Sequence, residues 1–323
     1  MPRLPSPSAG SYARAPAEPT DPPLVALMHG KRWDASLAGA AAAVALRASQ
    51  GGDTAPWFVR HAGWRAGYPY PISTLSMWRT PTGSTPPPDL VTWLASRTDA
   101  HDIGLVRARG DQQDVWIALT ATPLGSVGVQ PRQLPLGAAF TLPKLPGATF
   151  EVADGAGTVR SGRLDLAQTF TVERPGEWIV KVRHAEQVVA WFPIYVDRQP
   201  PSEPVIDVAT EGALDQRLDQ LLDHVRDQHA LPSLEPDLLF QSAAARLLTD
   251  PSMPSGTLAT RVGWAPEKLA RWDARGPTLA AALDRVIWEP GARPALLAAS
   301  GHLGLAAEQD DAGVHIVVLI GFD

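Results

Sequence analysis

The chain has 323 residues, which is enough for two or three domains, and its 45% hydrophobic and 19% charged residues are typical of a globular protein. The formal net charge of −6 gives no electrostatic support to binding of nucleic acid or of an anionic membrane. The absence of cysteine excludes disulfides, thiolate metal sites and a cysteine nucleophile.

Residues 1–23 are rich in proline, alanine and serine. This segment has no apolar run of the kind found in a signal peptide, and it has too few apolar residues to pack. We expect it to be a disordered tether from which a preceding export signal has been removed. No stretch approaches 18 consecutive apolar residues, so we expect no membrane-spanning helix.

Residues 24–122 carry mixed helical and strand patterns. A helical pattern begins at Leu24, and an alanine-rich helix is expected from about Trp33 to Ser49, with Asp34 or Ser36 as its N-cap. The stretch 56–88 is expected to be mainly loop. A helix is then predicted over 89–97, followed by a hairpin over 102–122 with its turn at Gly110-Asp111.

Residues 123–197 change character, because alternating apolar runs recur about every ten residues between glycine- and proline-bearing turns. This spacing predicts a small β-sandwich, Ig-like in class. A spacer or pairing domain is favoured over a ligand site. Residues 198–206 are expected to be a linker stiffened by proline.

Residues 207–323 begin with a strongly amphipathic segment. One helix face is predicted to hold Leu214, Leu218, Leu221, Leu222 and Val225. The helix is expected to break at 231–233, because proline removes a backbone donor there. A second helix should start near Pro236, with Leu238, Ala245 and Leu248 facing inward. A third helix is predicted over 278–288, followed by a final hairpin with its turn at 310–313.

Three motifs in this last segment carry a family resemblance. They are the turn 229–234 before an alanine-rich helix, the run 288–297, and the strand start at Leu303-Gly304-Leu305. Together they resemble bacterial members of the CAP superfamily, the fold of cysteine-rich secretory and pathogenesis-related proteins. The resemblance covers residues 213–323, and residues 24–122 more faintly. It implies an α/β/α sandwich and a periplasmic or extracellular location.

An internal duplication is indicated by matches in the same order along the chain. Residues 33–37 lie 201 positions before 234–238, Gly63-Trp64 lies 200 before Gly263-Trp264, and 103–105 lies 200 before 303–305. A second tryptophan follows each Gly-Trp pair, at Trp78 and Trp272. We therefore expect an α+β multidomain fold, in which two CAP-like α/β/α sandwich units, 24–122 and 207–323, flank a small Ig-like β-sandwich.

The resemblance implies a site of two histidines and two glutamates that can bind zinc. In the second copy, Ala292 stands at one family histidine, and Ala270-Arg271-Trp272 stand at the family's Gly-Glu-Asn turn. The first copy has Ser76-Met77-Trp78 at that turn, and His61 alone could match a family histidine. We therefore expect no metal, no cofactor and no catalytic residue.

Three further groups of residues are candidates for a site, but each has a simpler structural explanation. His302 and His315 are expected to face each other on the last hairpin as a structural pair rather than as metal ligands. Four aspartates at helical spacing are expected to form a solvated face, because calcium needs ligands that converge. Ser242 has no evident base, and no hydrolase or nucleotide-binding motif occurs. The four aspartates are Asp215, Asp219, Asp223 and Asp227.

The tryptophans are the remaining candidates for a binding surface, since an aromatic face suits the C–H groups of a sugar. Packing in the core and between domains is favoured over glycan binding, because tryptophan is also a large core residue. The sequence thus predicts a non-catalytic binding or structural module of the cell envelope or exterior, built from two inert CAP-like units. A divergent peptidase or glycan hydrolase is the alternative. The expected partners are another protein, a like subunit or cell-wall glycan, and not nucleic acid. The candidate surface residues are Trp57, Trp64, Trp78, Trp264 and Trp272.

Overall fold

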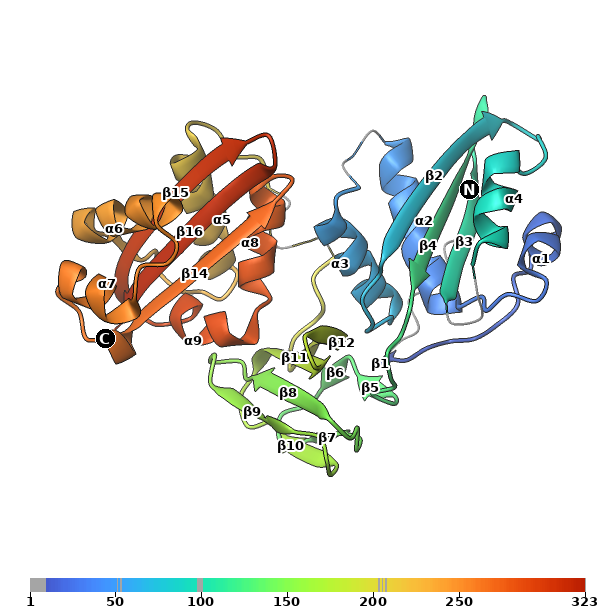
Figure 1. Cartoon of the computed structure of the whole chain (residues 1–323). Coiled ribbons are helices and arrows are strands. Elements are labelled where there is room, and N and C mark those ends of the chain that lie inside the picture. Colours follow the sequence, from blue (N-terminus) through green and yellow to red (C-terminus); the bar gives the residue numbers. More distant parts are fainter. Residues whose placement is uncertain are drawn as a thin grey trace. The chain divides into compact units, whose positions relative to one another are not determined.

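The computed structural model describes residues 10–50, 52, 54–97, 101–202, 204, 206 and 208–322. The chain is a mixed α/β protein with two compact units (Figure 1). Unit 1 comprises Met1–Phe150 and Ser161–Pro200, and unit 2 comprises Glu151–Arg160 and Pro201–Asp323. None of the helices in the described part of the chain is long and apolar enough to cross a membrane.

Unit 1 opens with an antiparallel three-stranded sheet and its helices. The strands lie in the order β2-β4-β3, and β3 and β4 form the predicted hairpin. The expectation of loop over 56–88 is wrong, because this stretch forms α3 and β2. Pro56 begins α3 and Gly67 ends it in the left-handed conformation, which are ordinary helix boundary signals. The elements are α1 (Pro22–Met28), α2 (Ala35–Ser49), α3 (Pro56–Ala66), β2 (Thr74–Pro81), α4 (Pro88–Ala95), β3 (Asp102–Arg109) and β4 (Gln113–Ala121).

Helices cover both faces of this sheet (Figure 1). On one face, side chains of α1 and α4 pack on Ile103, Leu105 and Trp116. On the other face, α2 lies against β3 and β4. Asp34 caps α2 as predicted, since its carboxylate accepts a hydrogen bond from the Leu37 backbone N–H at 2.9 Å.

The predicted strands are present between residues 130 and 196. One sheet has the order β6-β12-β11-β8-β9, and β7 pairs with β10 in a second. Aromatic side chains pack around Phe140, whose ring stacks on Phe170 at 5.1 Å and meets the edge of Trp178 at 6.3 Å. The strands are β5 (Gln130–Pro131), β6 (Gln133–Leu134), β7 (Ala139–Leu142), β8 (Ala148–Ala153), β9 (Val159–Arg163), β10 (Gln168–Thr171), β11 (Gly176–His184) and β12 (Gln187–Val196).

The expected disordered tether is wrong over its described part, residues 10–23; residues 1–9 lie outside the described residues. Strand β1 (Ser11–Tyr12) pairs with β5, and the Tyr12 ring is fully buried 5.0 Å from Phe192. Backbone hydrogen bonds then tie Ala13 to Gly67 and Ala17 to Trp33. The proline-rich composition does not indicate this packing. One buried aromatic side chain and backbone pairing are enough to hold an extended segment in place.

Unit 2 contains a sheet of order β13-β15-β16-β14. On one face, α6 and α7 pack on Ala306, Val317 and Leu319, while α5 and α8 lie against the other (Figure 1). The predicted final hairpin is formed by β15 and β16. The elements are α5 (Leu214–Asp227), β13 (Glu235–Pro236), α6 (Leu238–Thr249), α7 (Ser255–Val262), β14 (Leu269–Gly276), α8 (Leu279–Ile287), α9 (Arg293–Leu296), β15 (Gly301–Asp310) and β16 (Gly313–Phe322), with 3₁₀ turns at Pro266–Lys268 and Pro290–Ala292.

Helix α5 has the predicted inner face, with Leu218, Leu221, Leu222 and Val225 buried. The inner face predicted for α6 is right for Leu248, which packs against the core, and wrong for the other two residues. Leu238 is 87% exposed and Ala245 is also exposed, whereas another set of residues is buried. That set consists of Phe240, Ala243, Ala244 and Leu247, at i, i+3, i+4 and i+7.

Both helix-and-sheet regions run through the same order of elements. The order is α2-α3-β2-α4-β3-β4 in one and α6-α7-β14-α8-β15-β16 in the other, where the short helix α9 is inserted between α8 and β15. The strand orders β2-β4-β3 and β14-β16-β15 also correspond. A side chain at Gly104 would lie 2.6 Å from the backbone nitrogen of Ala38 in α2, and one at Gly304 would lie 2.7 Å from that of Gln241 in α6.

The Gly-Trp correspondence, however, is wrong. Gly63 lies inside α3, whereas Gly263 ends α7 in the left-handed conformation, as Gly67 ends α3. Trp78 and Trp272 are likewise not at the same register, because Trp78 lies opposite Trp116 and Trp272 opposite Val318. A constant offset of 200 therefore holds for the final hairpins but not for the elements before them.

Candidate functional site: an aromatic cavity in unit 1

A cavity of about 360 Å³ lies in unit 1 between α3, the start of β2 and β12. Its size falls at the lower end of the range of small-molecule pockets. Most of its lining side chains are apolar or aromatic. They are Thr54, Pro56, Val59, Arg60, Trp64, Tyr68, Tyr70, Pro71, Ile72, Ser73, Thr74, Leu75, Val188 and Trp191.

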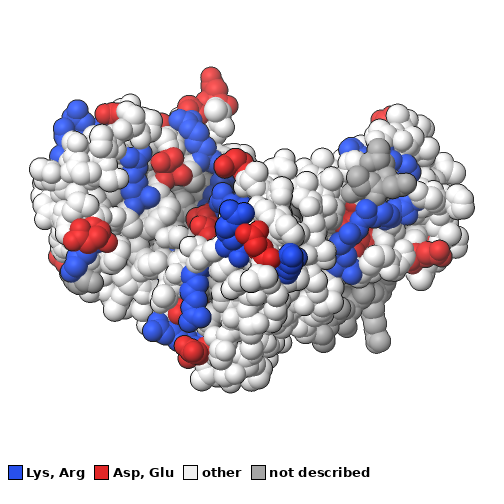
Figure 2. Space-filling model, turned by 60° about the horizontal axis from the view of Figure 1, so that its bottom comes forward, with Lys and Arg blue, Asp and Glu red and all other residues white. Residues whose placement is uncertain are grey.

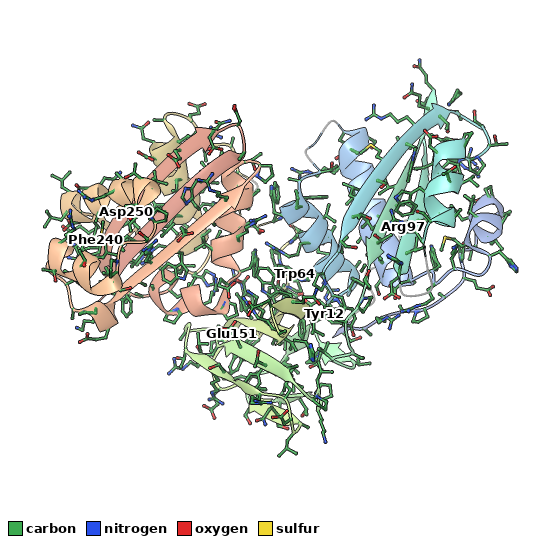
Figure 3. All side chains as sticks on the ribbon, viewed as in Figure 1. Tyr12, Trp64, Arg97, Glu151, Phe240 and Asp250 are labelled. Carbon is green, nitrogen blue, oxygen red and sulfur yellow. The ribbon has the colours of Figure 1, made fainter. Side chains whose placement is uncertain are left out.

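Two tryptophans form one wall of this cavity. Trp64 is buried on α3 (Figure 3), and Trp191 is half-buried on β12. The indole N–H of Trp64 donates to the backbone oxygen of Trp191 at 2.6 Å, and the two rings meet edge to face at 6.3 Å. The hydrogen bond and ring contact join elements that are 127 residues apart in sequence, so the wall is held in place by tertiary structure.

Two cations lie over the tryptophan rings. The Arg60 guanidinium is 4.5 Å from the centre of the Trp191 ring and 5.2 Å from that of Trp64, and Lys181 Nζ is 4.6 Å from Trp191. A cation over an indole face is attracted by the ring's quadrupole. The cavity wall therefore combines apolar surface with positive charge. Elsewhere the charges of both signs are interspersed on the face in Figure 2.

Hydroxyl groups lie at the β2 end of the cavity. Ser73 Oγ donates to the backbone oxygen of Thr120 at 3.0 Å, and Thr74 Oγ1 lies 2.5 Å from Thr120 Oγ1. The described lining contains no histidine, aspartate or glutamate. The Ser73 and Thr74 hydroxyls therefore have no carboxylate or imidazole of the lining beside them to act as a general base, so the β2 end of the cavity is suited to enclosing an apolar group rather than to activating a nucleophile.

Tyr68 connects the cavity to a buried ionic cluster. Its hydroxyl donates to Asp102 at 3.0 Å, and Asp102 also accepts hydrogen bonds at 2.5 Å from Arg14 and from Arg32. Burial raises the pKa of Asp102, and Arg14 opposes that shift. Burial and then the charge of Asp102 raise the pKa of Tyr68. The cluster holds Arg14, and with it the N-terminal segment, against the sheet.

The five tryptophans predicted from sequence do not gather on one surface. Of these, only Trp64 lines the cavity. Trp57 is buried under the Arg47 guanidinium, and Trp78 packs edge to face on Trp93 at 5.5 Å. Trp264 and Trp272 are half-buried in unit 2. Tyr70 and Trp191 also line the cavity but are not indicated by the sequence pattern, since Trp191 stands in an apolar strand run that indicates core.

The two candidate histidines do not face each other, so that prediction is wrong. In the β15–β16 register His302 lies opposite Gly321, and His315 lies opposite Glu308. His302 instead packs on Trp264 at 4.8 Å, with its Nδ1 3.4 Å from an Asp237 carboxylate oxygen. His315 Nδ1 lies 3.3 Å from Glu308.

Across the described residues, no group of three or more histidine, aspartate or glutamate side chains could hold a metal ion. The helix carrying the four aspartates spreads them apart, and Asp215 accepts a hydrogen bond from the Ala307 backbone at 2.8 Å. Of the residues that the resemblance aligned with the family's histidine and with its Gly-Glu-Asn turn, Ala292 is buried and Arg271 donates to the backbone oxygens of Met253 and Pro251.

Comparisons with known proteins give one weak structural likeness. No protein-family model matches the chain, and no curated protein matches it. Among solved structures, the chain is similar to an extracellular protein containing an SCP domain from Bacillus anthracis, with 15% sequence identity and a TM-score of 0.28. The match covers 46% of this chain and 57% of that one, which is less than two thirds of its length.

Proposed function

We propose that the protein is a non-catalytic binding module that acts in the periplasm or outside the cell. The observation that carries this proposal is the aromatic cavity, whose walls are fixed by the Trp64–Trp191 hydrogen bond and whose lining lacks an acid–base pair. An apolar or aromatic group of a partner protein is the ligand best suited to such walls.

The architecture we propose is two CAP-like α/β/α units flanking an Ig-like β-sandwich. The common element order and the paired close approaches at Gly104 and Gly304 support a duplication. The family motifs in residues 213–323 support the CAP-like assignment, and the two sheets between residues 130 and 196 support the sandwich. In this proposal both CAP-like units are inert, because the family's ligand positions hold alanine, arginine and tryptophan.

A protein partner is favoured over cell-wall glycan. Glycan binding needs an aromatic face that is open to a sugar ring. Trp57 and Trp64 are buried, and Trp78 packs against Trp93. A divergent hydrolase is the alternative function. It would need an acid–base residue for proton transfer, and of the usual residue types the described lining offers only tyrosine, of which Tyr68 is hydrogen-bonded to Asp102.

Binding of N-acetyl-phenylalaninamide tests the cavity. We expect saturable binding, followed through tryptophan fluorescence, and loss of that binding in Val188→Trp, which fills the cavity from its lining. Val129→Trp is the control, because Val129 is exposed and is not part of the lining. No saturable binding, or equal binding by both variants, would contradict the proposed site.

Metal analysis tests the non-catalytic part of the proposal. We expect the purified protein to retain no stoichiometric zinc after dialysis without chelator. One zinc per chain would overturn the proposal and favour the hydrolase.

A further inference from the structure

The cavity opens at the start of an edge strand. Strand β2 lies at the edge of its sheet. It pairs with β4 on one side, and within the described residues no strand pairs with its other side. An edge strand presents unpaired backbone N–H and C=O groups, which form a template for another strand. The cavity lining includes Ile72, Ser73, Thr74 and Leu75, at and just before the first residues of β2.

The first part of this edge lacks three of the features by which proteins usually prevent strand addition. These three are charged side chains, proline and β-bulges. From Thr74 to Trp78 the strand is Thr-Leu-Ser-Met-Trp, without charge or proline, and its pairing with β4 has no register shift. The first charged residue of β2 is Arg79, and the only proline of β2 is Pro81.

The corresponding strand of unit 2 gives an internal comparison. Leu75 and Met77 lie opposite Leu119 and Ile117 of β4, as Arg271 and Asp273 of β14 lie opposite Leu319 and Val317 of β16. The β14 edge is thus charged at the positions where the β2 edge is apolar. Arg271 and Asp273 also pair with each other at 3.5 Å. Arg79 and Arg275 are the next matched pair, opposite residues 115 and 315.

We infer that β2 and the cavity together bind an extended peptide segment of a partner protein. The peptide adds a strand to the β2 edge and places one apolar or aromatic side chain between α3 and Trp191. Backbone hydrogen bonds supply the pairing, and the cavity supplies the preference for a side chain, as in other cases of strand addition. This inference rests on the proposed function in using the same cavity, and it adds the peptide class of ligand and the strand that holds it.

Disulfide tethering on the full chain tests this inference, since the protein has no cysteine of its own. Arg79 is exposed near the far end of β2, so Arg79→Cys provides one thiol at the edge. Arg275→Cys is the matched control, because Arg275 is exposed at the same register of β14.

The probes are the peptides acetyl-Cys-Thr-Val-Thr-Val-Thr-Phe-amide and its reverse, so that both strand directions are sampled. The spacing between cysteine and phenylalanine is six residues, or roughly 20 Å in a strand, which reaches from Arg79 to the start of β2. Each probe has a counterpart with serine in place of phenylalanine, because the Arg60 and Lys181 charges at the cavity wall would attract a carboxylate.

At thiol-exchange equilibrium we expect Arg79→Cys to capture one phenylalanine peptide at least tenfold more than its serine counterpart. Arg275→Cys should show no such preference. In the Arg79→Cys adduct, amide hydrogen exchange should slow at least tenfold at alternate positions between Thr74 and Trp78. Equal capture of the two peptides, equal behaviour of the two variants or unchanged exchange in the adduct would each overturn the inference.

Two other outcomes identify what has failed. A disulfide-linked dimer of Arg79→Cys formed in preference to the peptide adduct would overturn the inference in favour of a second copy at the edge. If tethering fails while N-acetyl-phenylalaninamide still binds the cavity, the peptide inference is lost and the proposed cavity site stands. If that ligand also fails to bind, both are lost.

Discussion

Gly104 and Gly304 lie where a strand and a helix backbone approach each other too closely for any side chain. At each position an added Cβ would overlap backbone atoms of the helix, namely those of Leu37 and Ala38 in α2 and those of Phe240 and Gln241 in α6. The helix backbone cannot move aside without disturbing its packing on the sheet. The identity of these two residues is therefore set by the distance between layers and not by a turn.

We expect Gly104→Ala and Gly304→Ala each to lower the free energy of unfolding by about 3 kcal/mol or more, the upper part of the range for overpacking. Gly256→Ala is the control, because nothing lies within 4 Å of its added Cβ and it stands in helix α7. Alanine there should stabilise by up to about 1 kcal/mol through helix propensity. Urea unfolding measures all three, and equal effects would contradict the close-approach argument.

Asp114 is a second residue whose role is set by its surroundings. It is fully buried on β4 and accepts hydrogen bonds from Arg107 Nε at 2.9 Å, from Arg107 Nη2, and from the Gly83 backbone at 3.1 Å. Burial by itself would raise the pKa of Asp114. The hydrogen bonds from Arg107 and Gly83 outweigh burial, so the pKa lies below its ordinary value.

A lowered folded-state pKa means that the carboxylate stabilises the fold above about pH 4, the ordinary value, and that this stabilisation is lost as the pH falls through the lowered pKa. We expect Asp114→Asn to cost about 3 kcal/mol at pH 7, because it leaves the Arg107 charge buried without its partner. The loss of unfolding free energy caused by Asp114→Asn should become smaller below pH 4. Urea midpoints from pH 2.5 to 7 measure this, and a loss that grows on acidification would contradict it. Asp165→Asn, at an exposed ion pair with Arg163, should leave the midpoint unchanged.

In helix α6, the position of the N-cap decides which residues face the core. Its inner face is Phe240, Ala243, Ala244 and Leu247, while Leu238 and Leu239 at its start are exposed. Asp237 determines where this helix begins, since its carboxylate accepts from the Leu239 and Phe240 backbone N–H groups at 2.7 and 3.2 Å. In the first turn Phe240 is therefore buried while Leu238 and Leu239 are exposed, so hydrophobicity alone does not place a leucine inside.

We expect Leu247→Ala to lower the free energy of unfolding by about 2–5 kcal/mol, as for other buried leucines. Leu238→Ala should change it by less than about 0.5 kcal/mol, because that side chain is already in water. Thermal or urea unfolding of the pair checks the register. The opposite order of effects would mean that α6 is rotated.

The elements that could be predicted from sequence are those with a long, one-sided pattern or a clear turn. The α5 face, the Asp34 cap and both final hairpins follow from periodicity and from glycine or aspartate turns. Helix α3 and strand β2 were missed because prolines on both sides indicate loop. The cavity could not be predicted, since Trp64 and Trp191 meet only through tertiary structure.

At the scale of the molecule, the N-terminal segment connects parts of unit 1 that are far apart in sequence. Strand β1 pairs with β5, Arg14 donates to Asp102, and the Ala15 backbone donates to Asp34 at 2.6 Å. The segment thus binds the first sheet and the β-rich region at once. Its composition is typical of a disordered tether, but its backbone forms hydrogen bonds with both regions.

Tyr12 is the apolar anchor of this N-terminal segment, because its side chain is fully buried against Phe192. We expect Tyr12→Ala to lower the free energy of unfolding of unit 1 by about 3–5 kcal/mol, as for other large buried aromatics. Because the other contacts of residues 11–17 are polar and partly exposed, the segment should then open locally before the sheet unfolds. Limited proteolysis with trypsin should cut after Arg14 at least tenfold faster in Tyr12→Ala than in the parent chain. The matched control is Arg163→Ala on the exposed β9 edge, which should leave the rate of that cut unchanged. If Tyr12→Ala and the parent were cleaved at the same rate after Arg14, the segment would be held by the Arg14–Asp102 ion pair and the Ala15 backbone hydrogen bond to Asp34, and Tyr12 would not be its anchor.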